Sequence, residues 1–270
     1  MPELPEVETT RRGLSPHLER QRIKQVLVRD ARLRWPVPDD YAKRMRGATV
    51  TGITRRAKYL LWHSDAGITL VHLGMSGSLR IVEAGTEYKK HDHVEWQLDD
   101  GMVVRLHDPR RFGCVLWVDD VDTHPLLASL GPEPLGNAFS GEWLFERSRG
   151  RKQAIKTFIM DAKQVVGVGN IYASEAVFRA GIHPTRPAGR VSRARYDRLA
   201  DDIRAVLNDA LSAGGTTLRD FLRNDGEPGY FKQSLNVYDR EGEPCKQCGA
   251  PIRLRVIGQR SSYFCTSCQR

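Results

Sequence analysis

The spacing of the cysteines constrains the fold of the last part of this chain more tightly than any other feature of the sequence. Cys245 and Cys248 form one Cys-x-x-Cys pair, Cys265 and Cys268 form a second, and 16 residues lie between the pairs. This spacing matches a four-thiolate zinc site of the ribbon or hairpin type. Two disulfides are the alternative, but the chain shows no export signal, and reducing compartments disfavour disulfides. We therefore expect one structural zinc ion.

The charge balance indicates a polyanionic partner. Lys and Arg number 42 against 33 Asp and Glu, which gives a net charge of +9 at pH 7. Nucleic acid is the first candidate and an acidic membrane surface the second. No apolar run approaches the ~18 residues of a spanning helix. With 40% apolar residues in 270, the chain is long enough for one large globular domain or two ordinary ones.

Patterns along the chain divide it into a strand-rich part and a helical part. The N-terminal segment PELPEVETTRRGL predicts a helix, because Pro and acidic residues suit a first helical turn. Short runs rich in β-branched and aromatic residues then predict strands, and regular short strands favour a β-sandwich or barrel. These strand segments are 23–30, 58–64, 68–75, 78–84, 93–98, 102–107 and 114–120. Cys114 lies in the last of them and is expected to be a buried small hydrophobe.

Helical patterns replace the strands from about residue 131. Residues 144–161 and 171–182 flank the loop QVVGVGN, and apolar residues at helical spacing continue from Leu199 to Leu211. A glycine-bearing turn before a helix lets backbone N–H groups approach a phosphate. The loop VVGVGN lacks the Gly-Lys-Ser/Thr ending of a P-loop, and an ordinary helix–helix turn is the alternative.

Two loops in the strand-rich part carry residues suited to unstacking bases. HDPRRFG, residues 107–113, places Arg110 and Phe112 beside a proline that interrupts strand pairing. HLGMSGSL, residues 72–79, places Met75 between glycines. An aromatic or apolar wedge with an arginine beside it can open a base step.

In order along the chain, the segments PELPEVETTRRGL, RRAKYLL, HLGMSGSLR, KHDHV, DPRRFG, LGPEPL, VVGVGNIYASE, GGTTLRDF, PGYF and the cysteine hairpin resemble formamidopyrimidine-DNA glycosylases. The resemblance runs from residue 2 to residue 269. It implies an α+β multidomain fold: a β-sandwich with a flanking helix at 1–130, a helix–two-turn–helix domain at 131–236 and a zinc finger at 237–270. It further implies a bacterial base-excision enzyme that removes oxidised purines and then cuts the abasic site.

Pro2 gives this resemblance a chemical basis if Met1 is removed. An α-amino group has a pKa of about 7.7–8.0 against about 10.4 for lysine, so far more of it is neutral and nucleophilic near pH 7.5. A secondary amine that attacks the sugar C1′ gives an iminium with no N–H to lose, and the iminium serves as an electron sink. The target nucleotide must first be flipped out of the duplex.

The resemblance assigns the remaining roles by matching motifs. Glu3 is expected to be the general acid, Glu6 to orient the amine or a water, Lys58 to act in β-elimination and Arg260 in δ-elimination. The expected DNA contacts are His72, Met75, His91, Arg110, Phe112, Arg151, Lys156, Asn170 and Tyr238. Asp220 to Lys232 correspond to the stretch that closes over the extruded base in this family.

Two other functions stay open from the sequence. An endonuclease VIII-type glycosylase for oxidised pyrimidines shares the fold but typically begins PEGPE, so Leu4 favours the oxidised-purine branch. A non-catalytic zinc-ribbon protein that binds DNA explains the charge and the cysteines but leaves the N-terminus unexplained. We expect a monomer that acts on double-stranded DNA in the bacterial cytoplasm, at the nucleoid.

Overall fold

The computed structural model describes residues 2–214 and 235–270. Met1, the expected base-capping stretch Asp220–Lys232 and the motif PGYF lie outside the described residues, as does GGTTLRDF after its first glycine. The chain divides into two compact units. The N-terminal unit is built on Met1–Ala128 together with residues 211–214, and the C-terminal unit on Ser129–Ala210 together with the described residues from 235 onward.

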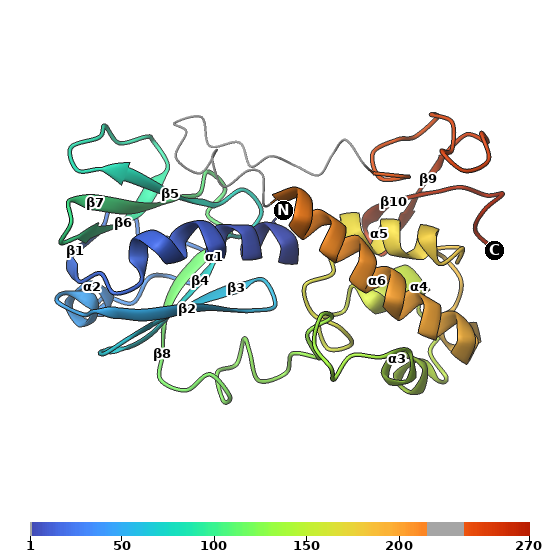
Figure 1. Ribbon diagram of the computed structural model, residues 1–270, viewed down its shortest axis with the longest axis horizontal. Helices are drawn as coiled ribbons and strands as arrows, with labels where there is room; N and C mark the ends of the chain where they lie inside the picture. Colours follow the sequence, from blue (N-terminus) through green and yellow to red (C-terminus); the bar gives the residue numbers. More distant parts are fainter. Residues whose placement is uncertain (1, 215–234) are drawn as a thin grey trace. The chain divides into compact units, whose positions relative to one another are not determined.

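Two four-stranded antiparallel sheets and two helices form the N-terminal unit (Figure 1). One sheet has the order β1-β6-β7-β5 and the other β2-β3-β4-β8. The helices are α1 (Leu4–Leu18) and α2 (Tyr41–Met45), and the strands are β1 (Ile23–Val28), β2 (Val50–Arg56), β3 (Tyr59–Ser64), β4 (Gly67–His72), β5 (Ser78–Glu83), β6 (Asp92–Leu98), β7 (Met102–His107) and β8 (Cys114–Val118).

A single apolar core joins both sheets to α1, which makes this unit the predicted sandwich rather than a barrel. Trp62 on β3 and Trp96 on β6 meet in it with ring centroids 4.8 Å apart. The indole N–H of Trp96 donates to the hydroxyl of Tyr41 at 2.9 Å, so the buried polar group has a partner. Cys114 is fully buried, as expected, and burial raises the pKa of its thiol to about 12.

The sequence patterns missed strand β2, whose residues VTGITRR include few of the apolar types that mark a strand. β2 lies at the edge of its sheet and pairs only with β3. Most of its side chains are polar, and only Val50 and Ile53 are buried. An edge strand of this kind carries a weak hydrophobic signal.

The C-terminal unit contains helices, one 3₁₀ turn and a two-stranded hairpin, and the predicted α+β class is confirmed. The segment 144–161, predicted to be helical, is broken by residues 149–154, where Gly150 has a φ of +72° that a helix does not accommodate. The elements of the C-terminal unit are α3 (Gly141–Ser148), α4 (Ile155–Ile159), α5 (Asn170–Arg179), η1 (Ala188–Arg190), α6 (Arg193–Gly214), β9 (Arg253–Ile257) and β10 (Arg260–Phe264).

Candidate functional site

The start of α1 fixes the peptide that follows Pro2. Glu3 is the N-cap of the helix and is only 2% exposed. The Glu6 carboxylate accepts the backbone N–H of Glu3 at 2.8 Å, which forms one half of a capping box. Glu3 and Glu6 therefore cap a helix and, at the same time, lie next to the expected nucleophile.

Lys58 lies in the two-residue turn that joins β2 to β3. The residue before it, Ala57, is buried and has a φ of +55°, a left-handed conformation that is uncommon for alanine. Arg55 holds this turn: its guanidinium donates to the carbonyl of Ala57 at 2.9 Å and to the Glu8 carboxylate on α1 at 3.2 Å. The turn that presents Lys58 is thus tied to the helix that presents Pro2.

His72, at the end of β4, lies beside the same turn. It pairs with Tyr59 across β3 and β4, and their ring centroids are 4.9 Å apart. Burial lowers the pKa of His72 to about 4, with contributions from the positive charges of Lys58 and Arg34. The Nδ1 atom accepts the backbone N–H of Gly74 at 3.0 Å. The ring is therefore neutral near pH 7 and carries its proton on Nε2.

The two predicted wedge loops lie side by side. A Cβ atom on Gly74 would lie 2.4 Å from the carbonyl carbon of Phe112, so the loop that carries Met75 contacts the other loop backbone to backbone. Phe112 is 41% exposed, and the guanidinium of Arg110 lies 4.9 Å from the centroid of its ring. Arg111 between them has a φ of +55°. The structure thus brings the expected wedge residues onto neighbouring loops.

His91 lies at the base of the second wedge loop. Its carbonyl accepts the N–H of Asp108 at 3.0 Å, and its ring centroid lies 5.9 Å from that of His107. His107 in turn donates from Nδ1 to the buried Asp92 carboxylate at 2.9 Å. His93, two residues further along the chain, is buried and only 5% exposed.

In the C-terminal unit, the structure brings Lys156 and Asn170 together. Asn170, the last residue of the motif VVGVGN, is the first residue of α5. Lys156 is fully buried, and its ammonium donates to Asn170 Oδ1 at 2.5 Å, to the Ser262 hydroxyl at 2.7 Å and to the Ser261 carbonyl at 2.9 Å. Lys156 therefore holds Asn170 against strand β10, rather than lying at the surface.

Arg260 is the first residue of β10, directly after a two-residue turn formed by Gly258 and Gln259. Both turn residues have positive φ, +55° and +61°, as a tight hairpin turn requires. Arg151 is exposed, and its N–H donates to the Ser148 carbonyl at 3.0 Å at the end of α3. The backbone of each arginine is therefore positioned by a turn: the Gly258–Gln259 turn for Arg260 and the turn at the end of α3 for Arg151.

Sequence reasoning missed Glu175, which holds the segment that carries Tyr238. Its carboxylate is 1% exposed and accepts four N–H bonds. Two come from the backbone and side chain of Asn236, both at 2.9 Å, one from the backbone of Val237 at 2.9 Å and one from the backbone of Tyr238 at 3.0 Å. Only the tertiary fold brings residues 61 to 63 positions apart together, so no local pattern marks Glu175.

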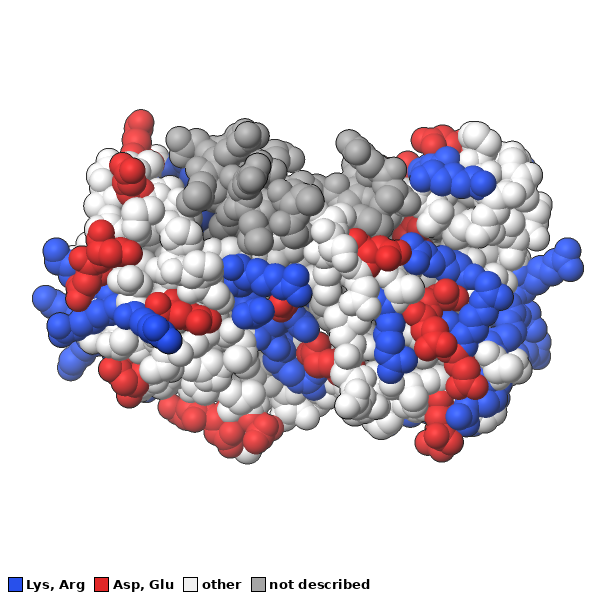
Figure 2. Space-filling view, viewed as in Figure 1, with Lys and Arg blue, Asp and Glu red and all other residues white. Residues whose placement is uncertain are grey.

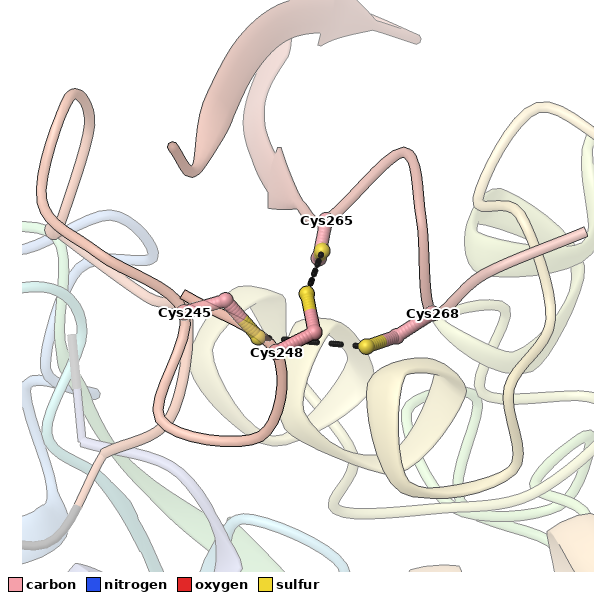
Figure 3. Close-up of side chains that lie close together, drawn as sticks. All are labelled: Cys245, Cys248, Cys265 and Cys268. Carbon is pink, nitrogen blue, oxygen red and sulfur yellow. Dashed lines mark hydrogen bonds between the residues drawn. The ribbon is translucent and has the colours of Figure 1, made fainter. Parts of the chain in front are cut away.

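The four paired cysteines converge as the zinc prediction requires (Figure 3). Their sulfur atoms all lie within 4.8 Å of one another, with 3.9 Å between Cys245 and Cys268 and 3.5 Å between Cys248 and Cys265. Four thiolates around a tetrahedral zinc ion at 2.3 Å would lie about 3.8 Å apart. All five cysteines are in the described part of the chain, and none forms a disulfide. The donor set therefore fits one structural zinc ion.

Comparison with known families places these parts in one kind of protein. Residues 1–115 match the N-terminal domain of formamidopyrimidine-DNA glycosylase, 130–222 match its H2TH domain, and 242–270 match a zinc finger found in FPG and IleRS. A formamidopyrimidine-DNA glycosylase of Syntrophotalea carbinolica is 60% identical over 271 residues, with all of both chains covered. The chain belongs to the formamidopyrimidine-DNA glycosylase family.

Other members of the glycosylase family extend the similarity. The relative from Stutzerimonas stutzeri is 58% identical over the full length of both chains. The crystal structure of MutM (Fpg) from Thermus thermophilus has a TM-score of 0.86 at 39% identity and covers 99% of this chain and 98% of that one. Lactococcus lactis Fpg in complex with abasic-site DNA has a TM-score of 0.90 at 29% identity and covers 99% of both chains. Members of the family combine base excision with cleavage of the abasic site, which favours an enzyme over the zinc-ribbon alternative.

The surface seen in Figure 2 shows how this glycosylase carries its charge. Basic and acidic side chains alternate there over both units, and along α6 many of them are paired. The α6 ion pairs are Arg179–Asp209, Arg193–Glu142, Arg193–Asp197, Arg198–Asp202 and Arg204–Asp201. That paired surface is not a basic field of the kind that binds DNA. Among the described residues, no helix is long and apolar enough to cross a membrane.

Proposed function

We propose that this protein excises oxidised purines from double-stranded DNA through covalent attack by the amine of Pro2. The observation that carries the proposal is the buried Glu3 carboxyl directly behind Pro2, in a chain that matches the glycosylase family over its whole length. Lactococcus lactis Fpg has been crystallised with DNA that contains Fapy-dG. The same lesion class is therefore our proposed substrate.

Base excision begins when the damaged nucleotide leaves the stack and its C1′ becomes accessible. The lone pair of Pro2 attacks C1′, the bond from C1′ to the sugar ring oxygen opens, and Glu3 donates a proton to that oxygen. The Pro2 nitrogen then loses the proton it carried, its lone pair forms the iminium as the base departs with its bonding electrons, and the departing base takes up one proton. Glu6, which already accepts the N–H of Glu3, orients the amine or a water.

Strand cleavage follows from the iminium. Its positive charge acidifies the C2′ proton, and loss of that proton expels the 3′ phosphate by β-elimination. Lys58 is our proposed proton-transfer group for this step, since Arg55 and Glu8 tie its turn to α1. Arg260 is proposed to serve the second elimination, which expels the 5′ phosphate. Its place beside a tight turn of the zinc hairpin fixes where its side chain begins.

The remaining side chains are proposed to hold the DNA. Neutral His72 offers its Nε2–H to a phosphate oxygen, and Asn170 serves the same purpose at the start of α5. His91, Arg151 and Tyr238 are proposed as further contacts. Met75, Arg110 and Phe112 would fill the space that the flipped nucleotide leaves. Zinc supplies folding energy to the hairpin when bound to the four thiolates. We place the activity, in a monomer, at the nucleoid of the bacterial cytoplasm.

Glu3→Gln tests the chemistry most specifically. Single-turnover excision from an 8-oxoguanine duplex should fall by at least about 100-fold, because a general acid contributes on the order of 10²–10⁴. Cleavage of a pre-formed abasic site, whose sugar ring opens to the aldehyde without the enzyme, should fall much less. Glu83→Gln, at the exposed end of β5, is the matched control. Equal losses on both substrates would exclude Glu3 as the acid that protonates the sugar ring oxygen during base excision.

A second substrate distinguishes the proposed oxidised-purine glycosylase from the oxidised-pyrimidine alternative. The wild-type protein should excise 8-oxoguanine faster than an oxidised pyrimidine in an otherwise identical duplex. The reverse order would favour the endonuclease VIII-type function for the same site.

A further inference from the structure

The loops 73–77 and 108–113 each connect one sheet of the sandwich to the other. The first leads from β4 to β5 and the second from β7 to β8. Because β4 pairs with β8 and β5 pairs with β7, the two loops begin and end beside each other. Met75 lies on the first loop, and Arg110 and Phe112 lie on the second.

The side chain of Asp108 bridges these loops. Its carboxylate is fully buried. Oδ1 accepts the hydroxyl of Ser76 at 3.2 Å, and Oδ2 accepts the backbone N–H of Gly113 at 2.8 Å. The carbonyl of the same residue accepts Nε2–H of buried His93 at 2.8 Å. A buried carboxylate is costly without such partners, so Asp108 favours the arrangement in which both loops supply a donor.

Glycines allow the loop backbones to touch at the bridge. A Cβ atom on Gly74 would lie 2.4 Å from the carbonyl carbon of Phe112, and one on Gly113 would lie 2.5 Å from the carbonyl oxygen of His72. Gly74 also has a φ of +63°, which other residues rarely adopt. The close backbone contacts and the hydrogen bonds of buried Asp108 together fix the position of the two loops relative to each other.

We infer that Asp108 is a positioning residue that locks the two loops into a single wedge before DNA binds. The inference rests on the proposed function, in which Met75 and Phe112 occupy the space left by the extruded nucleotide. Loops that are already ordered lose less conformational freedom on binding. Without the bridge, the loops would have to be ordered during insertion, and extrusion of the nucleotide would slow.

Ser76→Ala tests the bridge with a small change. It removes the donor to Asp108, whereas Ser76→Thr keeps a hydroxyl. Ser64→Ala is the matched control, because its hydroxyl donates to the Gly67 carbonyl at 2.8 Å in the β3–β4 turn, at the far end of β4. Extrusion is followed by the fluorescence of 2-aminopurine next to 8-oxoguanine. Cleavage of a single-stranded abasic oligonucleotide, which needs no wedge, is measured in parallel.

Ser76→Ala should slow extrusion by about tenfold, the effect of losing one hydrogen bond to a charged acceptor. Single-stranded cleavage should stay within about twofold of wild type, and Ser76→Thr and Ser64→Ala should match wild type in both assays. In a Phe112→Ala background, Ser76→Ala should slow extrusion by less than about a further twofold, because both changes act through the same wedge.

Three results would overturn the inference: wild-type extrusion in Ser76→Ala, an equal loss on the single-stranded substrate, or a full tenfold further loss in the Phe112→Ala background. A different result would count against the proposed function alone. That result is a wild-type protein that gives the extrusion signal but leaves the oxidised purine uncut.

Discussion

The ammonium of Lys156 on α4 lies 2.5 Å from Oδ1 of Asn170, the first residue of α5. The same ammonium donates to Ser261 and Ser262 on β10, and Asn170 donates from Nδ2 to the carbonyl of Ser261 at 3.0 Å. One buried cation thus joins the helix that begins at the proposed phosphate grip to the zinc hairpin that carries Arg260.

Replacing Lys156 by Met should therefore destabilise the C-terminal unit and weaken DNA binding. The change leaves the buried Ser262 hydroxyl and the half-buried oxygens of Asn170 and Ser261 with one donor fewer each. A lost donor costs about 1–3 kcal/mol at a buried group and less at a half-buried one, partly offset because the cation no longer has to be desolvated. We expect a net loss of about 2–4 kcal/mol in the free energy of unfolding, measured with denaturant. Exposed Lys163→Met is the control and should stay within about 0.5 kcal/mol of wild type. Equal stability of the two variants would contradict the structural role of Lys156.

Glu175→Gln should release the segment that carries Tyr238. A carboxamide offers only one acceptor oxygen and turns its NH₂ group toward N–H donors that the carboxylate now accepts. Hydrogen–deuterium exchange at residues 236–238 should accelerate, and the free energy of unfolding should fall by about 2–4 kcal/mol. Glu146→Gln, on the exposed side of α3, should change neither quantity. Unchanged exchange in Glu175→Gln would show that the segment is held by other contacts.

His72 makes stability depend on pH in a defined window. Its pKa is about 4 in the folded protein, because burial opposes the charged form, and about 6.5 when unfolded. Between these values the unfolded state binds the extra proton, so the contribution of His72 is present above pH 6.5 and is lost as the pH falls toward 4.

His72→Asn should remove this part of the pH dependence, because Asn keeps an acceptor for the N–H of Gly74 and does not titrate. Free energies of unfolding at several values from pH 4 to pH 7 give the comparison. The wild-type curve should fall more steeply with acid than the variant curve, by at most about 3 kcal/mol over the window. Parallel curves would mean that His72 is protonated at its ordinary pKa in the folded state.

Removal of zinc should unfold the hairpin and spare the sandwich. Cys245 and Cys265 form part of a small core with Phe178, Val237 and Ile252, which is too small to fold without its metal. A tight chelator should abolish exchange protection in residues 242–270 and lower DNA affinity, while the sheets of the N-terminal unit keep their protection. Full protection of the hairpin after verified metal loss would contradict this role.

Features with a local signal could be predicted from the sequence. The cysteine spacing predicted the cluster of four sulfur atoms, and the acidic residues behind Pro2 predicted the capped helix. Strands rich in buried apolar residues, such as β3 and β6, gave a clear hydrophobic signal. The largely polar side chains of β2 removed that signal, and Gly150 interrupted a helical pattern that composition alone continued.

Features that depend on tertiary contact could not be predicted in this way. The residues next to Asp108, Lys156 and Glu175 do not indicate that these charged side chains are buried, and each is buried because distant donors or acceptors surround it. Asp108 lies 32 residues from Ser76, Glu175 lies 62 residues from Val237 and Lys156 lies 105 residues from Ser261, and contacts at such separations leave no periodic pattern. The sequence resemblance indicated a DNA contact for Lys156, whereas its burial supports the positioning of Asn170.

Borohydride trapping tests the central claim most directly. Wild-type protein is incubated with an 8-oxoguanine duplex and sodium borohydride, and the N-terminal peptide is then analysed by mass spectrometry. We predict a reduced sugar–DNA adduct on Pro2, in a chain from which Met1 has been removed. A chain shown to begin at Pro2 that gives no adduct, or an adduct on Lys58 instead, would contradict the proposed nucleophile.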